Sequence, residues 1–207
     1  MPYIGTQPND VKKNTGLYTP SEILQLTKEG SWGGSLELIE DKTIPTVTSF
    51  EFTNLFEDVY DVHLFQWAGI EWVGGSDGMS MRVSNDNGST YESTANYSYG
   101  VQLIGVAGNT SESKRNGHTS YDRLAQQLQN APHNGYLYMY NAGNSSKYTF
   151  FTQQLNGSSV TSNYYDFRFG SGVYSVAETV NAIQFFTGTY SMTGNMKLYG
   201  VKQIWVT

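Results

Sequence analysis

A chain of 207 residues that is 38% hydrophobic, 14% aromatic and only 14% charged is long enough for one large all-β domain or two small ones. The high aromatic content excludes a disordered chain, and a net charge of −6 without a Lys/Arg cluster argues against a nucleic-acid-binding surface. The absence of cysteine excludes a disulfide framework, a thiolate metal site and a thiol nucleophile.

The N-terminal part of the chain predicts an arm followed by a short helix. Residues 1–18 mix Pro, Gly and polar residues without periodicity, so we expect an extended arm, either a frayed terminus or a segment that docks on a neighbouring subunit. They lack the basic start and apolar run of a signal peptide, and no segment reaches the ~20 apolar residues of a membrane span. In residues 19–30, Thr19 suits the N-cap, Pro20 the first helical position and Gly30 the end, which predicts one short helix.

Residues 31–207 predict a single all-β domain. Roughly ten to eleven short segments with strand patterns are separated by turn residues, which indicates a jelly-roll-like β-sandwich. The segment Tyr60–Trp72 has apolar side chains on both faces, as expected for a central strand. The remaining strands are expected near residues 32–39, 48–55, 79–84, 90–99, 101–106, 136–140, 147–155 and 164–174.

Two segments predict a turn or a loop, and a third fits either a helix or a strand. Asn87-Gly88 is a strong hairpin signal, so the strand at residues 90–99 should return along the preceding strand. Residues 108–119 are rich in Gly, Asn, Ser and Thr and predict a loop. The segment 121–128 fits a helical turn as well as a strand.

The end of the chain predicts two strands joined by a polar turn. On the first strand Ile183, Phe185 and Thr187 alternate with Gln184, Phe186 and Gly188. On the second, Met196 and Leu198 alternate with polar or amphipathic neighbours. Met196 and Leu198 should therefore point into the core. The turn between the strands, at residues 191–195, would make the pair a closing hairpin.

No metal site is predicted. His63, His118 and His133 are far apart, and no pair of them has the spacing of two metal ligands. The polar run around Asp86 fails the calcium-binding loop template, so a turn is the favoured interpretation, and a weak Ca²⁺ site using Asp77 and Asp86 is the alternative.

No catalytic site or cofactor site is predicted either. Glu57, Asp58 and Asp61 could in principle form the carboxylate pair of a glycosidase, but acidic clusters beside turns are usually solvated. A Gly-x-Ser-x-Gly nucleophile motif does not occur, and no Gly pair has the strand-to-helix setting of a phosphate-binding loop.

Tyrosines on the predicted strands are the candidate contact residues. A tyrosine ring buries a large area and keeps a polar tip, so it suits both a subunit interface and stacking against a sugar. Ordinary half-buried strand tyrosines are the competing interpretation. The candidates are Tyr97, Tyr99, Tyr136, Tyr138, Tyr140, Tyr164 and Tyr165.

Three motifs follow one another along the chain. They are KNTGLYTPSEI (13–23) running into GSWGGSLELI (30–39), YDVHL (60–64) with the later MRVSNDNGSTY (81–91), and GNMKLYGVK (194–202). Together these motifs resemble β-sandwich virion structural proteins of tailed bacteriophages, especially marine phages. Residues 108–134 match no motif of that kind.

The resemblance implies a non-enzymatic virion structural protein displayed on the particle exterior, as a head decoration (cement) protein or a tail fibre subunit. Its partners would be other capsid or tail proteins and further copies of itself, with a homotrimer expected, and neither nucleic acid nor a membrane. It would be made in the host cytoplasm, become part of the virion and be exposed after lysis. The alternative is a carbohydrate-binding or host-receptor-binding β-sandwich module that contacts a host surface glycan.

Overall fold

The computed structural model describes residues 19–21, 36–75, 77–105, 110–126, 131–158 and 165–201. The chain divides into two units, Met1–Gly34 and Ser35–Thr207. In the first unit Pro20 and Ser21 are helical, and the hydroxyl groups of Thr19 and Ser21 lie 3.1 Å apart in a hydrogen bond. The predicted arm at residues 1–18 and the rest of the predicted helix lie outside the described residues.

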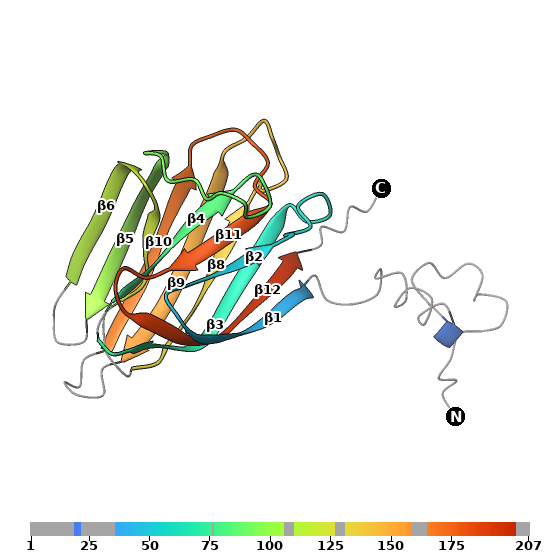
Figure 1. Cartoon of the computed structure of the whole chain (residues 1–207). Coiled ribbons are helices and arrows are strands. Elements are labelled where there is room, and N and C mark those ends of the chain that lie inside the picture. Colours follow the sequence, from blue (N-terminus) through green and yellow to red (C-terminus); the bar gives the residue numbers. More distant parts are fainter. Residues whose placement is uncertain are drawn as a thin grey trace, which may run out of the picture. The chain divides into compact units, whose positions relative to one another are not determined.

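The second unit is an all-β sandwich of two antiparallel sheets (Figure 1). Within the described residues its strands are β1 (Leu36–Val47), β2 (Ser49–Thr53), β3 (Val62–Val73), β4 (Gly78–Ser84), β5 (Tyr97–Gly105), β6 (Thr110–His118), β7 (Tyr121–Gln126), β8 (His133–Tyr140), β9 (Thr149–Ser158), β10 (Tyr165–Tyr174), β11 (Ala182–Phe186) and β12 (Ser191–Val201). The larger sheet has eight strands in the order β1-β12-β3-β8-β9-β10-β5-β6, and the smaller has four in the order β2-β11-β4-β7.

The chain repeatedly crosses between the two sheets. Strands β1 to β4 alternate between the larger and the smaller sheet, and the last two strands do the same. As a result the first strand of each sheet pairs with a strand from the end of the chain, β1 with β12 and β2 with β11. Sequential pairing occurs mainly in two places, between β5 and β6 and along β8, β9 and β10.

Aromatic rings fill the space between the sheets. Phe65 of β3 packs against Phe52 of β2 and Phe185 of β11, with both ring centroids 5.5 Å away. Phe50 stacks on Phe185 at 5.4 Å. Strand β3 is an interior strand between β12 and β8, as its two apolar faces predict.

The inward positions expected at the end of the chain are confirmed. Met196 and Leu198 of β12 and Ile183 and Phe185 of β11 are all fully buried in the core. Period-two alternation is therefore a sound guide to these faces.

The predicted closing hairpin is wrong. Strand β11 pairs with β2 and β4 in the smaller sheet, whereas β12 pairs with β1 and β3 in the larger sheet. The expected turn residues 191–195 belong to β12 and contain a bulge between Thr193 and Asn195. Gly194 has a φ of 145°, and a Cβ there would lie 2.7 Å from the Gly69 carbonyl oxygen, so this glycine serves close backbone approach inside a strand.

Asn87 and Gly88 form a turn but not a hairpin. Both have positive φ, 57° and 85°, as the sequence pattern requires. The following strand, β5, begins only at Tyr97 and joins the other sheet, so the returning strand predicted at residues 90–99 does not pair with β4. β5 continues to Gly105, so most of the separate strand expected at residues 101–106 is part of β5.

The loop predicted at residues 108–119 is largely a strand. β6 (Thr110–His118) pairs with β5 at one edge of the larger sheet. Most of its side chains are exposed, so it carries no apolar alternation by which the sequence could reveal it. The ambiguous segment at 121–128 is strand β7 over its described part.

Candidate functional site

The larger sheet has an inner face on the core and an outer face with unusual side chains. Along β8, Leu137 and Met139 are fully buried in the core, whereas Tyr136, Tyr138 and Tyr140 point to the outer face and are partly exposed. The same alternation holds along the neighbouring strands. The sheet register places the outer positions of adjacent strands next to one another.

The tyrosines of β8 form a ladder along the strand. The Tyr136 and Tyr138 rings meet edge to face at 5.6 Å, and Tyr138 stacks on Tyr140 at 6.1 Å with 22° between the ring planes. The Tyr136 hydroxyl donates a hydrogen bond of 2.9 Å to Oε1 of Gln154 on β9. The ladder is thus held in position by its own rings and by the next strand.

Phenylalanines continue this surface across the next two strands. Phe150 of β9 lies opposite Tyr140, and Phe169 of β10 lies one strand beyond Gln154. Phe150, Phe167 and Phe169 are 47%, 47% and 51% exposed. Phe167 and Phe169 are neighbours on one side of β10, and Phe150 lies beside Val173 farther along the same face. Exposed apolar groups that gather on one surface often mark an interaction site in soluble proteins.

We call these outer positions from β3 to β5 the aromatic face. They are Val62, Leu64, Gln66 and Ala68 of β3; Asn134, Tyr136, Tyr138 and Tyr140 of β8; Phe150, Thr152, Gln154 and Asn156 of β9; Tyr165, Phe167, Phe169, Ser171 and Val173 of β10; and Ser98, Gly100, Gln102 and Ile104 of β5. None of these positions carries a charged side chain, and the next outer position of β3, Glu71, is a charged residue at the border of the face. The polar groups on the face are amides and hydroxyls.

Charges flank the aromatic face rather than interrupt it. On one side, Lys197 of β12 forms an ion pair of 3.2 Å with Asp41 of β1. On the other side, β6 places Glu112 opposite Gln102 and Lys114 opposite Gly100. Each flank therefore has one positive and one negative group from these residues.

A shallow hollow of about 470 Å³ lies at the β6 side of the aromatic face. Phe169, Gln102, Glu112 and Lys114 are among its lining residues. Gly100 also lines it, and a Cβ added there would meet no atom within 4 Å. The hollow thus combines an exposed ring, an amide and one charge of each sign.

Two of the candidate tyrosines lie in the interior instead. Tyr97 is fully buried, packs on Tyr174 with ring centroids 5.1 Å apart, and accepts a hydrogen bond of 2.9 Å from the Val83 backbone N–H. Tyr99 donates to Asp122 at 3.2 Å, and burial together with that carboxylate raises the pKa of Tyr99 to about 12. Both tyrosines act as core residues with satisfied hydroxyl groups.

The structure brings four of the candidate tyrosines together on one surface. Tyr136, Tyr138 and Tyr140 form the ladder on β8, and Tyr165 lies on the same outer face at the start of β10. Tyr164 lies outside the described residues.

The sequence did not single out the three phenylalanines of the aromatic face. Alternation shows that Phe167 and Phe169 share one side of β10 and Arg168 the other, but not which side is inside. Burial rules would place the phenylalanines inside and the arginine outside. In the structure the two phenylalanines are outside and the arginine is inside, with Arg168 only 2% exposed.

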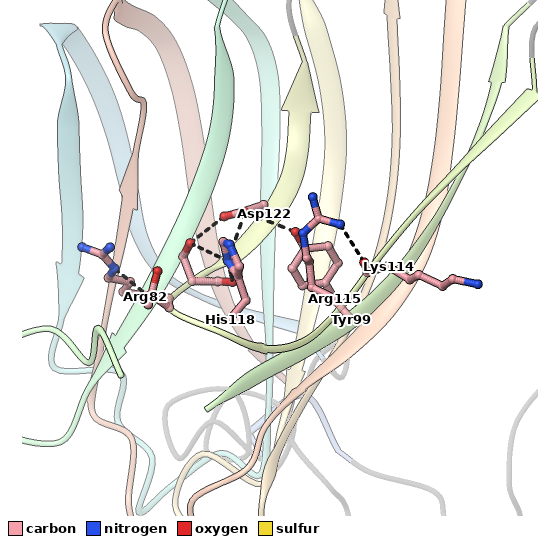
Figure 2. A network of polar contacts seen from close by, with 8 residues as sticks. Arg82, Tyr99, Lys114, Arg115, His118 and Asp122 are labelled. Atoms are coloured by element: carbon pink, nitrogen blue, oxygen red, sulfur yellow. Dashed lines mark hydrogen bonds and ion pairs between the residues drawn. The ribbon is translucent and has the colours of Figure 1, made fainter. Parts of the chain in front are cut away.

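A polar network surrounds the connection between β6 and β7 (Figure 2). Nδ1 of His118 lies 3.3 Å from Oδ2 of Asp122, and the Ser120 hydroxyl donates to Oδ1 of Asp122 at 2.6 Å. Ser120 also lies 3.5 Å from Nδ1 of His118. In a catalytic triad the carboxylate and the nucleophile occupy opposite nitrogens of the imidazole ring, so this arrangement does not activate the serine.

Asp77 and Asp86 hold turns together. Asp77 accepts hydrogen bonds from the backbone N–H groups of Gly78, Thr189 and Tyr190. Burial alone would raise the pKa of Asp77, but these N–H donors outweigh burial and hold it below its usual value. Hydrogen bonds from Thr90 and Ser84 lower the pKa of Asp86 to about 2.

Within the described part of the chain, no group of three or more His, Asp or Glu side chains could hold a metal ion. Nε2 of His63 donates to the Leu55 carbonyl oxygen at 2.7 Å, and burial lowers the pKa of this histidine. His133 is also fully buried, with Nδ1 2.9 Å from the Ala131 carbonyl oxygen. Glu57, Asp58 and Asp61 lie in the connection between β2 and β3.

Comparison with known proteins finds no match: neither a family model, nor a curated protein, nor a solved structure is significantly similar to the chain. Among the described residues, no helix is both long and apolar enough to cross a membrane.

Proposed function

We propose that this protein is a non-enzymatic structural subunit on the exterior of a tailed-phage particle, either decorating the head or built into a tail fibre. The observation that carries the proposal is the aromatic face, a charge-free surface with half-exposed phenylalanines. A structural subunit works by burying such a surface against a neighbour and needs no reacting group. Its partners would be other virion proteins and further copies of this chain.

The strand order supports a jelly-roll interpretation of the sandwich. The strands β1-β12-β3-β8 of the larger sheet and β2-β11-β4-β7 of the smaller sheet form a nested set of eight. In this set the chain winds around the sandwich from both ends, as a jelly roll with two Greek keys does. β5, β6, β9 and β10 then extend the larger sheet beyond that core, and part of the aromatic face lies on this extension.

The sequence motifs supply the link to phages. The motifs at residues 13–39, 60–91 and 194–202 resemble phage virion proteins, and jelly rolls are common in viral capsids. All three enter the sandwich. Residues 36–39 begin β1, residues 62–64 begin β3, residues 81–84 end β4 and residues 194–201 form most of β12.

Labelling of purified particles tests this proposal. An antibody raised against the purified chain should bind intact particles at regular positions on the head or the tail in electron micrographs. Mass spectrometry of the same particles should detect the chain in several copies. Particles that lack the chain after purification would refute the proposed function.

The second candidate is a carbohydrate-binding or receptor-binding module. The hollow beside Phe169 favours it, because an exposed ring next to Gln102, Glu112 and Lys114 can stack on a sugar and hydrogen-bond to its hydroxyl groups. Gly100→Val would fill the hollow from a position where a Cβ meets no atom. Loss of binding to host cells in that variant, with unchanged incorporation into particles, would favour this second function.

A further inference from the structure

We infer that the aromatic face is a contact between two copies of this chain, which pack the outer faces of their larger sheets against each other. This inference rests on the proposed function, because it names the partner that covers the surface of a structural subunit.

The first support is the contrast between the two outer surfaces of the sandwich. The outer face of the smaller sheet has an ordinary polar row, in which Gln184 lies between Glu51 and Arg82. The aromatic face instead exposes Phe150, Phe167 and Phe169. Antiparallel sheets that face water on one side normally place polar residues there. The smaller sheet follows that rule, and the larger sheet breaks it.

The second support is the size of the surface. Five adjacent strands at about 4.8 Å spacing and seven residues at about 3.4 Å rise give a patch of roughly 24 Å by 24 Å. A patch of that size is on the order of 600 Å² before side-chain relief is counted, which is close to the ~800 Å² per partner of a standard stable interface. Two such sheets can pack face to face with their strand directions about 30° apart, so the contact needs no rearrangement of either backbone.

The third support is charge. The chain has a net charge of −6, so two copies repel each other over most of their surfaces. The aromatic face is a broad area where two identical surfaces meet without opposing like charges, since none of its positions is charged. A two-fold contact requires a surface that complements itself, and an apolar sheet face with amides such as Gln102 and Asn156 meets that requirement.

The experiment measures the mass of the purified full-length chain by size-exclusion chromatography with light scattering, over a range of concentrations. The expected mass is twice 23.1 kDa. Phe169→Lys places a charge on an exposed position of the aromatic face and should raise the dimer dissociation constant by about tenfold or more. Thr152→Lys, on the central strand β9, is a gentler second variant because Thr152 is already exposed.

Gln184→Lys is the matched control, since it makes the same charge change on the outer face of the smaller sheet beside Glu51. Circular dichroism and thermal melts of all variants verify that each one is folded. The inference holds if the parent and Gln184→Lys are dimers while Phe169→Lys and Thr152→Lys dissociate. A monomeric parent at every concentration, a trimer, or a dimer that both aromatic-face variants leave intact would overturn it. None of these results decides whether the chain is found on particles, so failure here stays distinct from failure of the proposed function.

Discussion

Leu198 and Lys197 are neighbours on β12 whose side chains point to opposite faces of the larger sheet. Leu198 is fully buried in the core, and Lys197 forms an ion pair with Asp41 at the surface. Leu198→Ala should lower the stability by about 2–5 kcal/mol, because it leaves a cavity in a packed core. For a domain of this size that corresponds to a drop in melting temperature on the order of 10 °C.

Lys197→Ala is the control for this measurement, because exposed ion pairs contribute little to stability. Its melting temperature should stay close to that of the parent. Thermal melts of the three proteins suffice, and equal melting temperatures for Leu198→Ala and the parent would contradict the packing described for β12.

The lowered pKa of Asp77 predicts that the stability of the fold depends on pH. Its carboxylate accepts backbone hydrogen bonds from the connection between β11 and β12, and its folded pKa lies below the value of about 3.9 in an unfolded chain. A carboxylate with a lowered pKa contributes stability above about pH 4, and this contribution is lost as the pH falls through the folded pKa.

Asp77→Asn removes the titrating group and therefore isolates this effect. The parent should be more stable than Asp77→Asn at pH 7, and the difference should shrink as the pH falls below about 4. Urea unfolding of both proteins from pH 7 to pH 2 provides the measurement. A difference that stays constant over that range would show that the charge of Asp77 does not matter.

At the scale of elements, β12 is the strand that completes the larger sheet between β1 and β3. Stopping the chain before Gly194 removes most of its pairing with both neighbours and leaves their backbone groups unpaired beside the core. We expect the truncated protein to be insoluble, whereas the full-length chain expressed in parallel stays soluble. A soluble truncated protein with the circular dichroism spectrum of the parent would contradict this role of β12.

Local pattern predicted the strands better than it predicted their partners. The alternation in Tyr60–Trp72 and around Met196 identifies strands and faces, because it follows from the two-residue period of a strand. The closing hairpin failed because β11 and β12 cross between sheets, and no local residue records that crossing. β6 was missed because an edge strand with exposed sides needs no apolar residues.

The candidate site could be predicted only in part, for a related reason. Tyr136, Tyr138 and Tyr140 share a face by their spacing alone, and the structure places all three on the aromatic face. Tyr97 has the same spacing signal relative to Tyr99, yet both point inward. Which face of a strand meets the core depends on the opposite sheet, so neither the buried Tyr97 nor the exposed Phe169 could be assigned from sequence.

At the scale of the whole β-sandwich, the two outer surfaces have different chemistry. The smaller sheet has a polar row around Gln184 outside, and the larger sheet carries the aromatic face with charges at its borders. The central claim is that this face is covered by a second copy in the assembled protein. Two half-exposed rings of the face, Phe167 and Phe169 on β10, can report directly whether it is covered.

Hydroxyl-radical footprinting with mass spectrometry is the most direct test. Phe56, which is 42% exposed in the connection between β2 and β3, is a reference ring that does not belong to the aromatic face. Relative to Phe56, we predict that Phe167 and Phe169 are modified several-fold more slowly in the concentrated parent protein than in Thr152→Lys. Equal modification rates in the parent and in a Thr152→Lys protein that light scattering shows to be monomeric would mean that the aromatic face is open to solvent, and would contradict a contact between two copies there.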